Sequence, residues 1–417
     1  MVPGPGGGLF VSIPASAGSV LLAMLDSAGR LAAGWPVVLA GATSCGYLLP
    51  VQDGSVRVLC TPDELNRELN QGARAYAFDS KGTLLAGWPI DLTGYNFSAR
   101  MVGDDLTLLV SVSGGDVIEE GQPDHAVGLV TIGADGAIGR GVQAPRFWTW
   151  PGEGWAVGPN RIAYGVSGFS GFDEGSAEVS RITALGLTGV RAGWPVSFDG
   201  LASGPAFGPG GRIVLTVGSL VRSTSRVLTF DAAASAVSAS SAELPTATAE
   251  FGDTGGCGLG NPQPPLVAGD GTAFVLSWAT DAVYALDLSL KVKRGWPYEP
   301  ATSFVRRDSR YIREDAFCPS LSIPAVGPDS TLYLPLEASN ATVGGSIVAV
   351  GPDGRLRAGW PVELKNPGAE FWSVVVGSDG TVYALAIELE TSDSSSATIL
   401  AIAPDSTVIW TTTVVEP

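Results

Sequence analysis

The sequence has few of the residues that build metal centres, and it has no long apolar run. It has a single histidine in 417 residues, and four cysteines that never occur in a CxxC spacing. These residues are too few and too scattered for a zinc site, and we expect neither a metal nor a cofactor. No run of residues is apolar enough to cross a membrane, so no transmembrane segment is expected.

The N-terminus shows no export signal. Met1 is followed by Val-Pro-Gly-Pro, without a basic stretch or an apolar region, so no signal peptide is visible. Either a signal has been removed from this chain or the protein is cytosolic.

Charged residues are scarce and mostly acidic. They make up 16% of the chain, with 24 basic against 41 acidic residues, a net charge of −17 and a pI of about 4.4. Such a charge argues against nucleic acid or an anionic membrane surface as a partner. Glycine and proline are abundant instead, with 56 and 29 copies, and 45% of residues are apolar. This composition favours many short strands joined by tight turns over helices.

A recurring string organises the chain. It reads LDSAGRLAAGWPV at 25–37, FDSKGTLLAGWPI at 78–90, GLTGVRAGWPV at 186–196, LDLSLKVKRGWPY at 286–298 and VGPDGRLRAGWPV at 350–362. Its tryptophans, continued by Trp410, are separated by one or two periods of roughly 50 residues. Weaker copies at 131–145 and 227–239 fill the skipped periods.

A second string precedes each copy and reads as strand, tight Gly/Asp turn, strand, as in MVGDDLTLLV, LVAGDGTAFVL and VVGSDGTVYAL. Together the two strings predict a four-stranded meander, A to D, that must stack on neighbouring copies to bury both faces. We therefore expect an all-β fold, an eight-bladed β-propeller forming one domain over 1–417, with seven blades as the alternative. The expected blades are 1–41, 42–94, 95–146, 147–200, 201–250, 251–304, 305–366 and 367–417.

The strings resemble those of known propellers. Strands ending in alanine, an apolar residue and aspartate, followed by a DG-type turn and a tryptophan, resemble the repeats of PQQ-like, quinoprotein-type propellers. The fuller DGxLxxGWPV string is similar to segments of bacterial FG-GAP/VCBS-type surface propellers. The resemblance covers nearly the whole chain, but its residues are structural, so it implies a fold and hardly a function.

The repeated residues are expected to have structural roles. We expect each tryptophan to pack between neighbouring blades and the following proline to end strand pairing. The turn carboxylates should cap local backbone groups; these are Asp53, Asp270, Asp329, Asp353 and Asp379. The turns contain too few carboxylates for the calcium loops that FG-GAP-type repeats often carry.

The loop lengths predict which face of the propeller binds a partner. The A–B and C–D turns are short, whereas the B–C and D–A connections are longer and open on one face, which should carry function.

Two segments on that face stand out. Trp148, Trp150 and Trp155 could stack on sugar rings, or could fill a gap between blades. Arg306, Arg307, Arg310 and Arg313, with Tyr311, could grip carboxylates, phosphates or sulfates, or could pair with acidic residues of their own loop. Trp372, after the seventh repeat string, is a further ligand-binding candidate.

The cysteines predict disulfides. If the strands on either side of the turn at 52–54 pair, Cys45 falls beside Cys60; Cys257 and Cys318 could form a clasp between blades. Two disulfides would indicate an oxidising compartment, so we expect a secreted, periplasmic or cell-surface protein; four buried thiols are the alternative.

No catalytic residues can be assigned. The first functional hypothesis is a non-catalytic extracellular or envelope binding or scaffold propeller that recognises a glycan or a protein partner. The second is a polysaccharide lyase or glycosidase that uses loop carboxylates or the arginine segment on the same face. The single histidine excludes only those lyases that rely on histidine clusters. A PQQ-dependent dehydrogenase is the third, although the adjacent cysteine pair that many alcohol-oxidising members carry is missing here.

Overall fold

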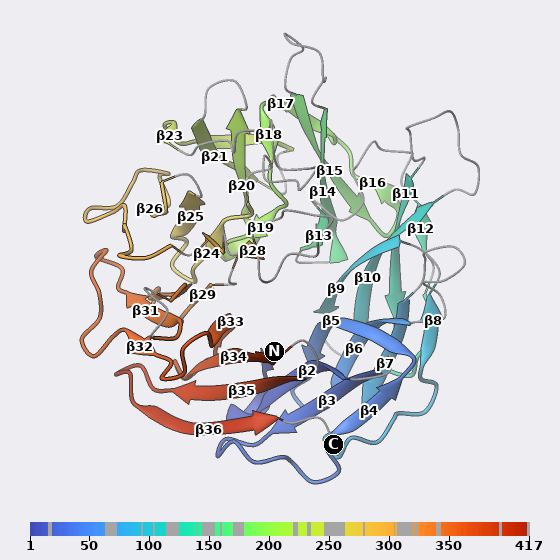
Figure 1. Ribbon diagram of the computed structural model, residues 1–417. Coiled ribbons are helices and arrows are strands. Elements are labelled where there is room, and N and C mark those ends of the chain that lie inside the picture. Colours follow the sequence, from blue (N-terminus) through green and yellow to red (C-terminus); the bar gives the residue numbers. More distant parts are fainter. Residues whose placement is uncertain are drawn as a thin grey trace. The chain divides into compact units, whose positions relative to one another are not determined.

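The chain is an all-β protein, an eight-bladed β-propeller of antiparallel blades (Figure 1). The computed structural model describes residues 1–15, 19–62, 73–92, 95–102, 105–113, 125–139, 141–143, 155–158, 161–169, 179–219, 224–231, 235–245, 263–277, 280–303, 305–306, 320–321, 324–338, 343–391 and 394–414. Within these ranges there is no α-helix, and the only helical turns are the 3-10 turns η1 (Pro5–Gly7) and η3 (Pro209–Gly211). The fold class expected from the repeats is therefore confirmed.

The first compact unit covers Met1–Gly200 with Ala233–Ala236 and Glu416, and it holds four blades. Blade 1 comprises β1 (Val2–Pro3), β2 (Leu9–Ala15), β3 (Ser19–Leu25) and β4 (Val37–Ala40); blade 2 comprises β5 (Ala42–Pro50), β6 (Val56–Pro62), β7 (Ala73–Phe78) and β8 (Ile90–Leu92). Blade 3 comprises β9 (Tyr95–Val102), β10 (Asp105–Ser113), β11 (His125–Ile132) and β12 (Val142–Gln143). Blade 4 comprises β13 (Trp155–Val157), β14 (Ala163–Phe169), β15 (Val179–Gly186), β16 (Gly189–Val190) and β17 (Val196–Asp199).

The second unit covers Leu201–Ala232, Val237–Val415 and Pro417. Blade 5 comprises β18 (Leu201–Ala202), β19 (Ala206–Phe207), β20 (Ile213–Ser219), β21 (Thr224–Asp231), β22 (Ala236–Ser240) and β23 (Leu244–Pro245). Blade 6 comprises β24 (Leu266–Val267), β25 (Ala273–Ser277) and β26 (Ala282–Leu286), with Tyr298 bridging to Val283; β27 (Val305–Arg306) and β28 (Ser320–Leu321) form a separate pair. Blade 7 comprises β29 (Ala325–Val326), β30 (Leu332–Leu336), β31 (Ser346–Val350) and β32 (Val362–Glu363). Blade 8 comprises β33 (Glu370–Val376), β34 (Val382–Thr391), β35 (Ser394–Ile402) and β36 (Val408–Val414).

The repeated tryptophans join one blade to the next, as predicted. Trp35 is buried among core residues of blades 1 and 2, with Phe10 and Phe78 edge-on to its ring. Its indole N–H donates to the carbonyl of Ser80, in a turn of blade 2, at 3.2 Å. The same bond joins Trp88 to Ala134, Trp296 to Pro352 and Trp360 to Pro404, at 3.1–3.3 Å.

The glycine before each tryptophan is required by the same contact. Gly295 has φ +91°, and a Cβ built on it would lie 2.1 Å from the carbonyl oxygen of Asp353 in blade 7. Gly34 and Gly87 approach the turns of their neighbouring blades in the same way. Only glycine combines this backbone conformation with so close an approach. The Gly-Trp-Pro motif, whose Trp–Pro bonds are all cis, is therefore a clasp between blades.

The turn aspartates cap backbone groups, which confirms that prediction. In each case the carboxylate accepts the backbone N–H two residues further on, at 2.8–3.3 Å; the residues are Asp53, Asp270, Asp329, Asp353 and Asp379. Four of these turns are the A–B turns of blades 2, 6, 7 and 8, and Asp353 lies in the C–D connection of blade 7.

Long connections at the B–C and D–A ends of the strands cover 63–72, 114–124, 144–154, 170–178 and 246–265, but the C–D connections at 26–36, 79–89 and 351–361 are as long as that at 114–124. The expectation that the C–D turns are short is therefore wrong for blades 1, 2 and 7. Other connections at the B–C and D–A ends are short, however. Gly41 alone joins β4 to β5, residues 16–18 join β2 to β3, and residues 392–393 join β34 to β35. The expectation that B–C and D–A connections are generally long is therefore wrong for these connections, and it is also wrong for the D–A connections at 93–94 and Gly200 and the B–C connections at 220–223 and 278–281.

Candidate functional site

Trp372 is the more exposed of the two tryptophan candidates that the structure describes, Trp155 and Trp372. Trp372 lies on β33, the strand at the first edge of blade 8, and 38% of its surface is exposed. The pairing of β33 with β34 shifts register between Phe371 and Ser373, so Trp372 is the extra residue of a β-bulge. A bulge changes the direction of a side chain. Phe371 and Val374 of this strand are buried, whereas Trp372, the extra residue between them, is exposed. Sequence reasoning selected this tryptophan but could not see the bulge.

Trp155 has a different setting. It is the first residue of β13 and lies against a small core cluster that contains Leu129 of blade 3 and Val157 of blade 4. A Cβ on Gly165 of the paired strand would fall 1.9 Å from its ring, so the ring covers the backbone at that glycine. The structure shows Trp155 as a packing residue between two blades, and its contact with a ligand stays a prediction.

The arginine segment is described only at its start. Arg306 belongs to β27 and pairs in register with Ser320 of β28. The remaining candidates lie outside the described residues; they are Trp148, Trp150, Arg307, Arg310, Tyr311, Arg313, Cys257 and Cys318. Their roles stay predictions.

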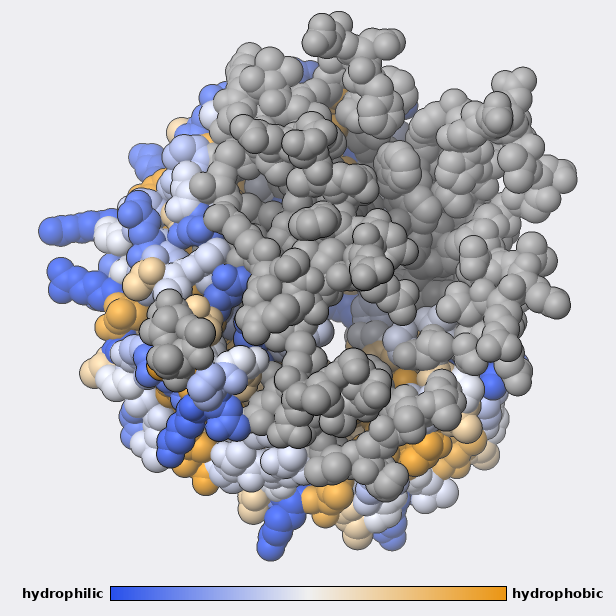
Figure 2. Space-filling view, in the orientation of Figure 1, coloured by the Kyte–Doolittle hydropathy of each residue, from blue (hydrophilic) through white to orange (hydrophobic). Residues whose placement is uncertain are grey.

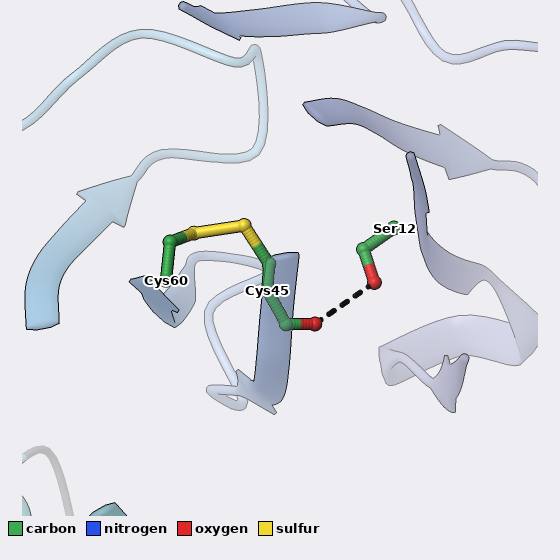
Figure 3. The surroundings of a disulfide bond; sticks show 3 residues. All are labelled: Ser12, Cys45 and Cys60. Carbon is green, nitrogen blue, oxygen red and sulfur yellow. Dashed lines mark hydrogen bonds between the residues drawn. A yellow bond between two sulfur atoms is a disulfide. The ribbon is translucent and has the colours of Figure 1, made fainter. Parts of the chain in front are cut away.

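The predicted pairing of Cys45 with Cys60 is confirmed. The two residues are directly opposite each other on β5 and β6 and form a disulfide with a Cα–Cα distance of 4.0 Å. The hydroxyl of Ser12 in blade 1 donates to the carbonyl of Cys45 at 3.1 Å (Figure 3). The disulfide therefore links the first two strands of blade 2 at a place where blade 1 also makes contact.

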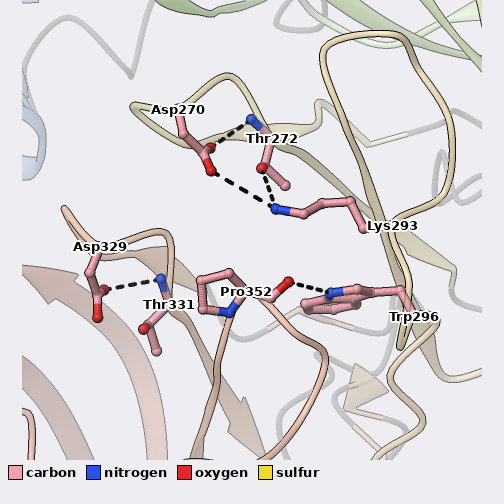
Figure 4. A network of polar contacts seen from close by, with 7 residues as sticks. All are labelled: Asp270, Thr272, Lys293, Trp296, Asp329, Thr331 and Pro352. Atoms are coloured by element: carbon pink, nitrogen blue, oxygen red, sulfur yellow. Dashed lines mark hydrogen bonds and ion pairs between the residues drawn. The ribbon is translucent and has the colours of Figure 1, made fainter.

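Basic side chains meet the turn aspartates in blades 6 and 7. Lys293 donates to the hydroxyl of Thr272 at 3.0 Å and lies 3.9 Å from the carboxylate of Asp270 (Figure 4). Arg357 occupies the same repeat position in blade 7 and donates to Asp329 and to Thr331. Sequence reasoning missed this pair, although a basic residue three positions before the tryptophan in both repeats was a usable signal.

Arg57 is a second residue that the sequence did not reveal. It is 3% exposed on β6, donates to the hydroxyl of Ser55 at 3.2 Å, and lies over the ring of Trp88 at 5.7 Å from the centroid. A guanidinium over an indole face is a stabilising cation–π contact. Its position inside blade 2 gives it a structural role.

The described turn carboxylates are poor candidates for acid–base chemistry. The backbone N–H of Arg30 is the main cause that holds the pKa of Asp26 below its usual value, and the N–H of Thr83 does the same for the pKa of Asp79. A general acid needs a raised pKa, so these groups act as ionised hydrogen-bond acceptors. Among the described residues, no three His, Cys, Asp or Glu side chains come together as a possible metal site, and no helix is long and apolar enough to cross a membrane.

Comparisons with known proteins identify no relative by sequence. No protein-family model and no curated protein matches the chain. Solved structures are similar in architecture. The streptogramin B lyase structure has 12% identity and a TM-score of 0.41, over 90% of this chain and 94% of that one. The β-propeller domain of the Trilobed protease from Pyrococcus furiosus has 9% identity and a TM-score of 0.45, over 97% and 95%.

A protein from Lactobacillus plantarum has 13% identity and a TM-score of 0.48, over 98% of this chain and 97% of that one. Likenesses of this extent carry no information on activity.

Proposed function

We propose that this protein is a non-catalytic binding propeller that recognises a glycan or a protein partner at the B–C and D–A end of its blades. The observation that carries the proposal is Trp372, an exposed tryptophan held by a β-bulge at the first edge of a blade. Sites on rigid strands hold their side chains more precisely than sites on loops alone. A flat aromatic ring that remains 38% exposed on such a strand suits stacking on a sugar ring or an apolar anchor of a partner.

We propose that the arginines at 307, 310 and 313, which belong to the same compact unit as Trp372, contribute to this site. The tryptophans at 148 and 150 belong to the first unit and stay separate ligand-binding candidates. Arginines in an otherwise acidic protein would select a ligand with carboxylate or sulfate groups. We therefore favour an acidic glycan over a neutral one.

We further propose that the protein works outside the cytoplasm, as a secreted, periplasmic or cell-surface protein. The Cys45–Cys60 disulfide supports this, because such bonds persist in oxidising compartments and are rare in the cytosol. Exposure of intact cells to a membrane-impermeant biotin reagent, followed by fractionation, tests the location. Recovery of unlabelled protein with the soluble cytosolic fraction alone would contradict it.

We propose that the chain is related to PQQ-like and FG-GAP/VCBS-type propellers. The proposal rests only on the similarity of the repeat strings. Titration of the purified protein with PQQ, followed by absorbance, tests whether the relationship extends to the cofactor. We expect no saturable binding.

A glycan array with the purified protein tests the binding function. We expect Trp372→Ala and Arg310→Ala to lose binding to acidic glycans at least about 10-fold, the loss expected when a good stacking or bidentate contact is removed. Leu356→Ala is the matched control, because Leu356 is 47% exposed in the C–D segment of blade 7 and lies outside the proposed site.

Two outcomes would count against the proposal. Binding that falls equally in all three variants would indicate a general effect on the fold. Release of shortened or unsaturated sugars from a polysaccharide panel would replace binding with a lyase or glycosidase activity at the same face. An array without any signal would remove glycans as ligands and leave a protein partner.

A further inference from the structure

The outer strand of blade 8 differs from the outer strands of the other blades. β36 is seven residues long and pairs with β35 from Val408 to Val414. The outer strands β4, β8, β12, β17, β22, β23 and β32 have only two to five residues. In five repeats a proline follows the tryptophan, whereas Trp410 is followed by Thr411. Because proline has no N–H for a ladder, its absence lets β36 run through the tryptophan position.

The composition of β36 also sets it apart. Its sequence, VIWTTTV, contains no charge, no proline and no glycine, and six of its seven residues are β-branched. These are the strongest strand-forming residues. Natural edge strands are protected from pairing by lysines, prolines or short length, and β36 has none of these. Its one protective feature is a bulge at Ile409, which leaves Trp410–Val414 as a regular edge.

β36 is an edge strand in the described part of the chain. β36 ends the strand order of its sheet, and no strand other than β35 pairs with it there. Val408 and Ile409 are 44% and 53% exposed, and Thr411 and Thr413 are exposed as well. Figure 2 shows hydrophobic residues interspersed with hydrophilic ones among the described residues of one face.

We propose that β36 is an interface with a second copy of this chain, in which two β36 strands pair antiparallel about a two-fold axis. A chain with a net charge of −17 repels its copies, so a contact between copies needs an uncharged surface. In a two-fold contact each residue lies opposite the same residue of the other copy or a near neighbour of it. A charged strand would therefore place like charges opposite each other. β36 brings threonine opposite threonine instead, a favourable cross-strand pair. Within blade 8 such a pair already exists, with the hydroxyls of Thr398 and Thr413 3.4 Å apart.

The expected dimer is weak. One pair of strands this short buries less than the ~1,200 Å² of typical stable interfaces. We therefore expect a dissociation constant of about 10–100 μM. The dimer should dissociate on dilution and should join two four-stranded blades into one eight-stranded sheet.

Sedimentation velocity of the full chain between 1 and 300 μM tests the dimer. We expect concentration-dependent dimerisation that Thr411→Lys weakens at least about 10-fold, because a lysine on each strand brings two like charges together. Ser197→Lys is the matched control, since it adds the same charge at an exposed position of the outer strand β17 in blade 4; it should leave dimerisation unchanged. Far-UV circular dichroism and thermal unfolding verify that both variants fold.

Hydrogen exchange at the two ends of this concentration range locates the contact. Amides of 410–414 should exchange more slowly at 300 μM than at 1 μM, whereas those of β17 should not change. A monomer at every concentration overturns the proposal, and so does a dimer that Thr411→Lys leaves intact or that gives 410–414 no added protection.

Discussion

Gly295→Ala should lower the free energy of unfolding for two reasons: the backbone conformation of the residue disfavours alanine, and the added Cβ disturbs the contact with blade 7. Alanine at φ +91° costs about 1–2 kcal/mol. The added Cβ would also lie 2.1 Å from the carbonyl oxygen of Asp353, so the turn at 351–354 in blade 7 has to move. That movement breaks the 3.3 Å bond from the indole of Trp296 to Pro352. Leaving a buried donor unsatisfied costs about 1–3 kcal/mol, and the total is about 2–5 kcal/mol.

Gly368→Ala is the matched control. Gly368 lies in the same compact unit at φ +82°, but a Cβ built there has nothing within 4 Å. This variant should lose only the backbone contribution, about 1–2 kcal/mol. Urea unfolding followed by tryptophan fluorescence gives both values, and the difference between the variants measures the clasp.

The indole bond can be separated from the steric contact by adding Trp296→Phe. If Gly295→Ala already breaks the bond, the two substitutions together should cost less than the sum of their separate effects. Equal destabilisation by Gly295→Ala and Gly368→Ala, or full additivity with Trp296→Phe, would refute the assignment of Gly-Trp-Pro as a clasp between blades.

Two further predictions concern the disulfide and the turn carboxylates. Replacing both Cys45 and Cys60 by serine should lower the free energy of unfolding by about 3 kcal/mol, because the bond closes a loop with a sequence separation of 15; an unchanged urea midpoint would contradict a stabilising role. The pKa values of Asp26 and Asp79 are lowered in the folded chain, so their contribution to stability is present above the ordinary aspartate pKa of about 4 and is lost as the pH falls through the folded values. The melting temperature should therefore decline below about pH 5, and Asp79→Asn should flatten that decline; a decline of the same steepness in the variant would show that Asp79 does not contribute.

The sequence revealed the fold because the repeat carries the contacts that build it. Trp35 and its equivalents mark the spacing of the blades, and their N–H bonds to the next blade recur at the same repeat position. The turn at 52–54 brought Cys45 close to Cys60 in the sequence, and the register shift between Cys45 and Tyr47 places the two cysteines directly opposite each other. A fixed period was sufficient to predict the blades, and the local turn was sufficient to predict which cysteines pair.

Contacts that do not repeat were invisible in the sequence. Arg57 lies over the ring of Trp88, which belongs to the connection between β7 and β8, and no periodic pattern relates the two positions. The bulge at Trp372 is one extra residue in one strand, which a reading of alternation places on the wrong face. Trp155 was placed in a loop although it begins β13, because aromatic residues outside the repeat string had no assigned structural position.

The repeat also indicates where function should be sought. A residue present in most copies builds the scaffold: the tryptophans join neighbouring blades and the aspartates cap their own turns. Such a residue cannot distinguish one blade from another. Functional differences must therefore arise where a blade departs from the pattern. Blade 8 departs twice, with the bulged Trp372 at its first edge and the proline-free Trp410 at its last. The two departures lie on opposite edges of one sheet, so a ligand at the first edge and a second copy at the last could occupy the same blade without competing.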